Sequence, residues 1–233
     1  ASIVFMFTAL CLFIFAHATS DFTEDRKKPN SLLYVQDLDA KKAYWFTYDS
    51  ILDDWTKTYI GSDPKEASTL FNSSARSKYN SGYTFAAEAP HFDIPHYQAT
   101  TTQDTLIGDQ RKVSLKFLAE KKAAVLLLYV DQEIIFSSLS YNGVDVVENL
   151  SFTEKNNRLL TFSVQELDSL EVSYTLPQGI NPTFTLHEYS FDLMDNPWVE
   201  VSPRTNSMMP KPFVFNDALV IKQKITPRSS VLE

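Results

Sequence analysis

The residues with metal-binding chemistry gather in one short stretch, Ala89–His96. His91, Asp93 and His96 offer two imidazoles and one carboxylate, which are ligand types that zinc accepts. His91 and Asp93 would share one face if the stretch formed a strand. Two prolines bracket the stretch, however, and favour an exposed loop in which polar side chains are ordinary. We therefore predict no metal site, and these three residues are the candidates if one exists.

No other group of residues completes a catalytic pattern. His187-Glu188 lacks the second histidine of the helical H-E-x-x-H zinc motif, and the segment has strand character. No G-x-S-x-G motif surrounds a serine, and Cys11 lies in an apolar run where a thiolate is disfavoured. Asp37 and Asp39 could hold Ca²⁺ from a turn, but D-x-D spacing is common by chance. We predict no catalytic and no cofactor-binding residue in this chain.

Aromatic side chains are the enriched class, with 17 Phe, 11 Tyr and 3 Trp in 233 residues. Most aromatic residues fill a core, but an exposed one can bind a ligand. Trp198 lies in the proline-rich stretch 195–212, so we predict that it is exposed and name it as a possible ligand-contact residue. The formal net charge of −8 argues against a nucleic-acid partner, and no glycine-rich phosphate-binding motif is present.

The elements that must position these residues have the pattern of short strands. Residues 32–35 and 43–48 are rich in aromatic and β-branched side chains and predict a hairpin. Leu52, Trp55 and Tyr59 recur at helical spacing and predict a short helix over residues 50–59 that ends near Gly61. The further predicted strands are 83–87, 97–107, 112–119, 123–130, 133–140, 159–165, 169–176, 183–191 and 217–225. Turn residues punctuate them at intervals of about 8–12 residues, which favours an all-β, antiparallel β-sandwich with one or two short helices over residues 31–233.

Residues 1–20 differ from the rest of the chain because they contain no Asp, Glu, Lys or Arg. We predict that they are the C-terminal part of a transmembrane helix, because a span needs about 20 apolar residues and this run is slightly shorter. A secretory signal peptide, with the small-x-small site Ala16-His17-Ala18, and a buried helix are the alternatives. Residues 21–30 then form a charged linker. In the first two interpretations the main domain is extracytoplasmic, periplasmic or lumenal, and the membrane is a partner through residues 1–20.

Several short patches resemble the C-terminal tail of one family of membrane proteins. The patches are residues 30–39, 43–45, 52–56, 87–90, 204–213 and 217–218. They resemble membrane-embedded zinc metallopeptidases of metallopeptidase family 28, the aminopeptidase Y type, whose relatives include vacuolar membrane protease and endoplasmic reticulum metallopeptidase. The chain looks most like the bacterial, Bacteroidetes-type members. In that family a zinc exopeptidase domain precedes several transmembrane helices and a C-terminal extracytoplasmic β domain.

The resemblance implies a non-catalytic accessory domain. The family's dizinc ligands do not carry over, because His91-Phe92-Asp93 matches only the first H-x-D and lacks the downstream carboxylates. Zinc is then expected in an upstream catalytic domain, and the catalytic and transmembrane domains of the same parent chain are the expected partners. The domain would stabilise that assembly or screen peptides. The alternatives are a secreted stand-alone glycan- or peptide-binding module that uses Trp198, and a small hydrolase or metal protein centred on His91, Asp93 and His96.

Overall fold

The computed structural model describes residues 2–70, 82–121, 123–148, 150–154, 156–163 and 169–227. Its helices are α1 (Ser2–Ala18), α2 (Asp54–Ile60) and α3 (Ala67–Leu70). The strands of the first half are β1 (Lys28–Asn30), β2 (Leu33–Asp37), β3 (Lys42–Thr47), β4 (Lys65–Glu66), β5 (Phe85–Ala89), β6 (Tyr97–Ile107) and β7 (Gln110–Ala119). Those of the second half are β8 (Val125–Val130), β9 (Ile134–Ile135), β10 (Ser138–Tyr141), β11 (Val144–Asp145), β12 (Ser151–Phe152), β13 (Arg158–Ser163), β14 (Ser169–Pro177), β15 (Phe184–Ser190), β16 (Met208–Pro210) and β17 (Ala218–Ile225).

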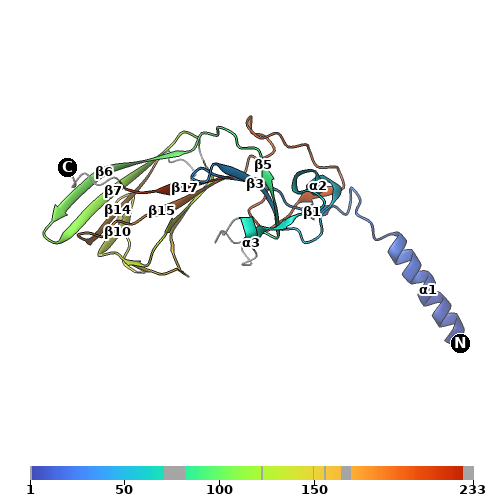
Figure 1. Ribbon diagram of the computed structural model, residues 1–233. Helices are drawn as coiled ribbons and strands as arrows, with labels where there is room; N and C mark the ends of the chain where they lie inside the picture. Colours follow the sequence, from blue (N-terminus) through green and yellow to red (C-terminus); the bar gives the residue numbers. More distant parts are fainter. Residues whose placement is uncertain are drawn as a thin grey trace.

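Two packed sheets form the main body, as Figure 1 shows. The larger sheet has the strand order β13-β8-β15-β17-β2-β3-β5-β4, and the smaller has the order β11-β10-β14-β7-β6. The half of the larger sheet around β8 and β15 packs on the smaller sheet, whereas β2, β3 and β5 extend beyond it towards α2 and α1. The predicted all-β sandwich with short helices is therefore confirmed.

The sandwich core comes from strands whose side chains alternate between two faces. In β8, Leu126, Leu128 and Val130 face the smaller sheet, while Leu127 and Tyr129 enter a second core on the other face. This confirms the prediction that this apolar run is buried on both faces. In β14 only alternate residues are fully buried, as the alternating sequence predicts.

The β2–β3 hairpin and most strands lie where the sequence predicts them, whereas the helix predicted over residues 50–59 begins later, since α2 covers Asp54–Ile60. Asp53 caps α2, and Gly61 ends it with a φ of 83°, which favours glycine. The predicted strand at 133–140 is two strands, β9 and β10. Two pairings are parallel, β17 with β2 in the larger sheet and β1 with β16 in a separate pair, so the larger sheet is mixed, whereas the pairings of the smaller sheet are all antiparallel. Periodicity assigns a side chain to a face but does not identify the partner strand.

The N-terminal segment joins the domain through β1, which occupies the last three residues of the predicted linker. β1 pairs in parallel with β16 from the proline-rich stretch, so Lys28 lies opposite Met208. α1 precedes it, projects away from the sandwich and contributes no buried residue (Figure 1). Among the residues that the structure describes, no helix is both long and apolar enough to cross a membrane.

Candidate functional site

The predicted metal candidates lie in the loop between β5 and β6 and do not form a cluster. His91 and Asp93 are exposed, and His96 is half-buried with its Nδ1 atom 3.1 Å from the carbonyl oxygen of Ile94. The Nε2 atom of His96 lies 3.3 Å from the side-chain nitrogen of Gln98. Within the described ranges, no group of three or more His, Cys, Asp or Glu side chains is placed to hold a metal ion.

The same loop is held to the larger sheet through its backbone. The Tyr34 hydroxyl donates to the carbonyl oxygen of Pro90 at 2.7 Å, and the Gln36 amide donates to that of Phe92 at 2.9 Å. The backbone N–H of Phe92 donates in return to the Gln36 side chain at 3.1 Å. Ile94 is buried beside these contacts. The loop conformation is therefore set by β2, and it leaves the two polar side chains at 91 and 93 in solvent.

Asp37 and Asp39, the candidate calcium ligands, hold a turn and a strand pair instead. One Asp37 oxygen accepts from the backbone N–H groups of Asp39 and Ala40, at 3.1 and 3.0 Å, and the other accepts from Lys222 at 2.7 Å. Asp39 accepts from the backbone N–H of Lys224 at 2.7 Å. Burial alone would raise the pKa of Asp37, but Lys222 and the two N–H groups hold it below its ordinary value.

Trp198, the candidate ligand-contact residue, is half-buried rather than fully exposed. Its indole packs against the core that contains Leu193 and Val199, and the Lys121 ammonium lies 5.6 Å from the ring centroid. Asn196 accepts hydrogen bonds from the backbone of residues 198 and 199, which fixes this part of the proline-rich stretch. The ring is therefore partly covered and is not a fully open platform for a sugar.

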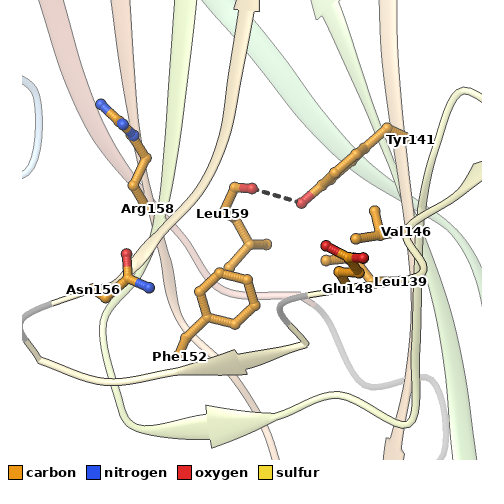
Figure 2. Close-up of a pocket in the computed structure, with 8 residues that line it drawn as sticks. All are labelled: Leu139, Tyr141, Val146, Glu148, Phe152, Asn156, Arg158 and Leu159. Atoms are coloured by element: carbon orange, nitrogen blue, oxygen red, sulfur yellow. Dashed lines mark hydrogen bonds between the residues drawn. The ribbon is translucent and has the colours of Figure 1, made fainter.

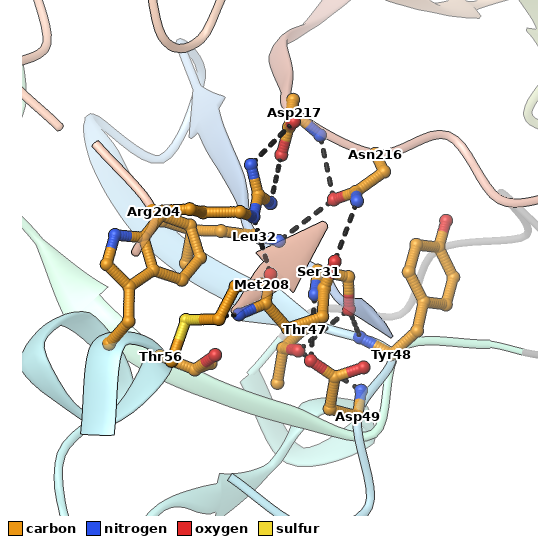
Figure 3. Close-up of polar contacts among 12 residues, drawn as sticks. Ser31, Leu32, Thr47, Tyr48, Asp49, Thr56, Arg204, Met208, Asn216 and Asp217 are labelled. Carbon is orange, nitrogen blue, oxygen red and sulfur yellow. Dashed lines mark hydrogen bonds and ion pairs between the residues drawn. The ribbon is translucent and has the colours of Figure 1, made fainter. Parts of the chain in front are cut away.

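A buried polar cluster at the α1-proximal end of the domain joins four distant segments (Figure 3). We call it the proximal network, and it consists of Asn30, Ser31, Asp49, Asp53, Arg204, Lys211, Asn216 and Asp217. The fully buried Asn30 donates to Asp53 at 2.9 Å and accepts from Arg204. Arg204 also donates through two nitrogens to the Asp217 carboxylate and lies 4.4 Å from the Trp55 ring centroid. A guanidinium can make two parallel hydrogen bonds to a carboxylate and at the same time stack on an aromatic ring.

The remaining members of the proximal network bind backbone groups, and Asp49 also binds the Lys211 ammonium. Asn216 accepts from the backbone N–H of Leu32 at 3.0 Å and donates to the carbonyl oxygen of Asn30 at 2.9 Å. Asp49 accepts from the backbone N–H of Ser31 at 2.8 Å and from Lys211 at 3.0 Å. Each of these carboxylates and amides is thus used to hold chain segments together, which is a structural role.

Most of the proximal network lies in the patches that carry the family resemblance. Those patches are far apart in the sequence, and the structure brings residues 30–56 and 204–217 into contact. Residue types alone do not reveal the network, since Asn30 and Arg204 are separated by 174 residues. The patches of resemblance were the one sequence feature that pointed to these segments, and they did not indicate which residues are in contact.

A cavity of about 340 Å³ lies between the β10–β11 hairpin and the segment from β12 to β13 (Figure 2). We call it the distal cavity, and it is lined by Leu139, Tyr141, Val146, Glu148, Phe152, Asn156, Arg158 and Leu159. The Tyr141 hydroxyl donates to the carbonyl oxygen of Leu159 at 2.8 Å and so links the two sheets across it. Sequence reasoning missed this cavity because its walls come from different sheets.

Two buried titratable residues lie side by side on β15 and point to opposite faces of the sheet. Glu188 accepts from the backbone N–H of Tyr97 at 3.0 Å and from Gln223 at 2.8 Å, and burial raises its pKa to about 7. Burial, and then the nearby Lys222 charge, lower the pKa of His187 to about 3. His187 and Lys222 line a second cavity of about 220 Å³ on the face of the larger sheet that does not pack on the smaller sheet. His187 is therefore a neutral imidazole at neutral pH.

Comparisons with known proteins do not assign this chain to a family. No protein-family model matches it, and no curated protein sequence matches it. Among solved structures, that of the N-terminal domain of PorA matches over 54% of this chain and 84% of that chain, with 14% sequence identity and a TM-score of 0.25. A likeness at that TM-score carries no argument about fold or function. The resemblance to family 28 metallopeptidases stays a prediction.

Proposed function

We propose that this chain is a non-catalytic accessory domain of a membrane-anchored zinc metallopeptidase of the family 28 type, with α1 as its membrane attachment. The observation that carries the proposal is the exposure of α1. Every described side chain of this apolar helix is exposed, including Phe5 at 73% and Phe13 at 72%. Burying apolar surface is favourable by about 25 cal/mol per Å², so a helix of this composition is stable only where lipid or other helices cover it.

The attachment of α1 to the domain supports this role. Arg26 donates to the carbonyl oxygen of Thr19, the first residue after the end of the helix, and Glu24 accepts from Asn206 at 3.0 Å. β1 then pairs with β16, and the proximal network secures both strands. The accessory domain would therefore be held in one orientation near its anchor, as a domain that stabilises an assembly or screens peptides requires. On this proposal zinc belongs to the upstream catalytic domain and the body of the chain is extracytoplasmic.

Flotation with liposomes tests the attachment. The full chain should float with phosphatidylcholine vesicles, and the double substitution Leu10→Asp and Phe13→Asp should abolish flotation, because charged side chains are costly in the bilayer. Ile107→Asp, which places a charge on an exposed apolar site at the tip of β6, is the matched control and should float as the wild type does. A wild-type chain that stays monomeric in the aqueous fraction would contradict the proposal.

A further inference from the structure

The distal cavity has the size and lining of a site for one apolar side chain. Leu139, Phe152 and Leu159 form its floor and belong to the sandwich core, with relative exposures of 2%, 5% and 8%. The hydrogen bond from Tyr141 to the backbone of Leu159 holds the two walls at a set separation. A volume of about 340 Å³ falls at the lower end of the range for ligand pockets. The floor is therefore preformed.

The rim of the cavity extends this apolar surface into solvent. Val144 lies opposite Tyr141 in the β10–β11 register, so the two side chains share one face of the sheet. Val144 is 71% exposed, and Val147, which follows the lining residue Val146 in the sequence but does not itself line the cavity, is 88% exposed. Val144 therefore extends the apolar surface of the cavity into solvent on the side of Tyr141.

Opposite charges flank the cavity. Figure 2 shows Glu148 on one side of the Phe152 ring and Arg158 on the other. Within the described part of the chain neither side chain forms an ion pair, so both charges face solvent at the mouth. A carboxylate binds an ammonium group, and a guanidinium binds a carbonyl or carboxylate oxygen.

We propose that the distal cavity binds the amino end of a short peptide. The first side chain, which is apolar, lies on the floor, the terminal ammonium contacts Glu148, and the following carbonyl or carboxylate groups contact Arg158. A free amino acid carries both charges on one carbon, whereas a peptide separates them by about 3.3–3.6 Å per residue and so spans opposite walls. An apolar floor with two unlike charges fits a peptide better than a glycan, which presents hydroxyl groups. If the domain screens peptides, this site makes short peptides with a free amino end the class that it screens. The inference rests on the proposed function only for the source of those peptides.

Isothermal titration of the full chain in detergent micelles tests this site with Leu-Gly-Gly as the probe. We expect saturable binding of Leu-Gly-Gly, and about two- to fivefold weaker binding of its N-acetylated form, because ion pairs at an exposed mouth are modest. Glu148→Gln should weaken the free peptide by the same factor and remove the difference between the two forms. Arg158→Gln should weaken both forms. Glu133→Gln, at an exposed site that does not line the cavity, is the matched control and should change neither.

A cavity-filling variant separates binding from folding. Val146→Trp should abolish binding of Leu-Gly-Gly while the midpoint of thermal unfolding stays within a few degrees of that of the wild type. No saturable binding at millimolar peptide, equal binding of the acetylated form, or binding of oligosaccharides in preference to peptides would each overturn the inference. These outcomes leave flotation through α1 unchanged, so failure of the peptide site and failure of the membrane attachment are distinguishable.

Discussion

Glu188 carries a buried carboxyl group between the two sheets, and its replacement by glutamine should change how stability depends on pH. The side chain accepts two hydrogen bonds, from the backbone of Tyr97 and from Gln223, yet burial dominates and raises its pKa to about 7. Lys121 lowers that pKa and Glu120 raises it. Glu188→Gln removes the titration and keeps the volume of the side chain.

The magnitude follows from the two pKa values. In the unfolded chain the Glu188 carboxyl ionises near its ordinary pKa of 4.5, whereas in the folded chain it keeps its proton until about pH 7. The folded state binds more protons in this interval, so the free energy of unfolding falls as pH rises through it. At about 1.4 kcal/mol per pH unit the full loss is about 3 kcal/mol, of which about 2.5 kcal/mol falls between pH 5 and pH 8.5.

Urea denaturation of both proteins at pH 5 and at pH 8.5 measures this loss. His187, whose pKa is lowered to about 3, has the opposite effect, because its unfolded form binds more protons below its ordinary pKa of 6.5. That contribution is present in both proteins and cancels in the difference between them. In Glu188→Gln the new –NH₂ group faces one of the two hydrogen-bond donors, which destabilises the folded state. This cost is the same at both pH values and therefore cancels in the comparison between them.

The free energy of unfolding of Glu188→Gln, taken relative to that of the wild type, should therefore rise by about 2.5 kcal/mol from pH 5 to pH 8.5. For the exposed control Glu133→Gln, the free energy of unfolding relative to the wild type should be the same at both pH values. A Glu188→Gln gain below about 0.5 kcal/mol would refute the reasoning, because it would mean that the buried carboxyl titrates near its ordinary pKa.

Three substitutions test the contacts that hold the two candidate sites. Asp53→Ala removes the cap of α2 and should lower the free energy of unfolding by about 1–2 kcal/mol, whereas the exposed Asp54→Ala should change it by less than about 0.5 kcal/mol. Arg204→Ala should cost about 2–3 kcal/mol in urea denaturation, because it leaves the part-buried Asp217 carboxylate without its fork; a neutral result would show that the proximal network is not stabilising. Tyr141→Phe should cost about 1 kcal/mol and lower the thermal midpoint, and an unchanged midpoint would contradict the bridge across the distal cavity.

The elements of the fold were largely predictable because their side-chain periods are strong. β6 occupies residues 97–107 as predicted, and α2 contains Trp55 and Tyr59 and ends at Gly61 as predicted, although it begins at Asp54 and leaves Leu52 outside the helix. The parallel pairing of β17 with β2 was not predictable, because the strands lie far apart in the chain and an alternating pattern assigns faces without naming partners.

The candidate sites were less predictable, since both depend on contacts between distant segments. In the sequence Arg204 is one charged residue of a proline-rich stretch, and only the fold shows that it binds Asn30 and Asp217. The sequence drew attention to His91 and Asp93 through residue type, but the hydrogen bonds from β2 to that loop decide where their side chains lie. Burial, which sets the pKa values of His187 and Glu188, likewise depends on the packed sheets.

The reading frame upstream of the codon for Ala1 tests the proposed function most directly. The proposal predicts that the frame continues through further transmembrane helices into a zinc exopeptidase domain that carries the H-x-D motif, the further carboxylate and histidine ligands and a general-base glutamate. An initiator methionine with basic residues within a few codons of Ala1 would contradict it, because residues 1–20 would then be the apolar part of a signal peptide.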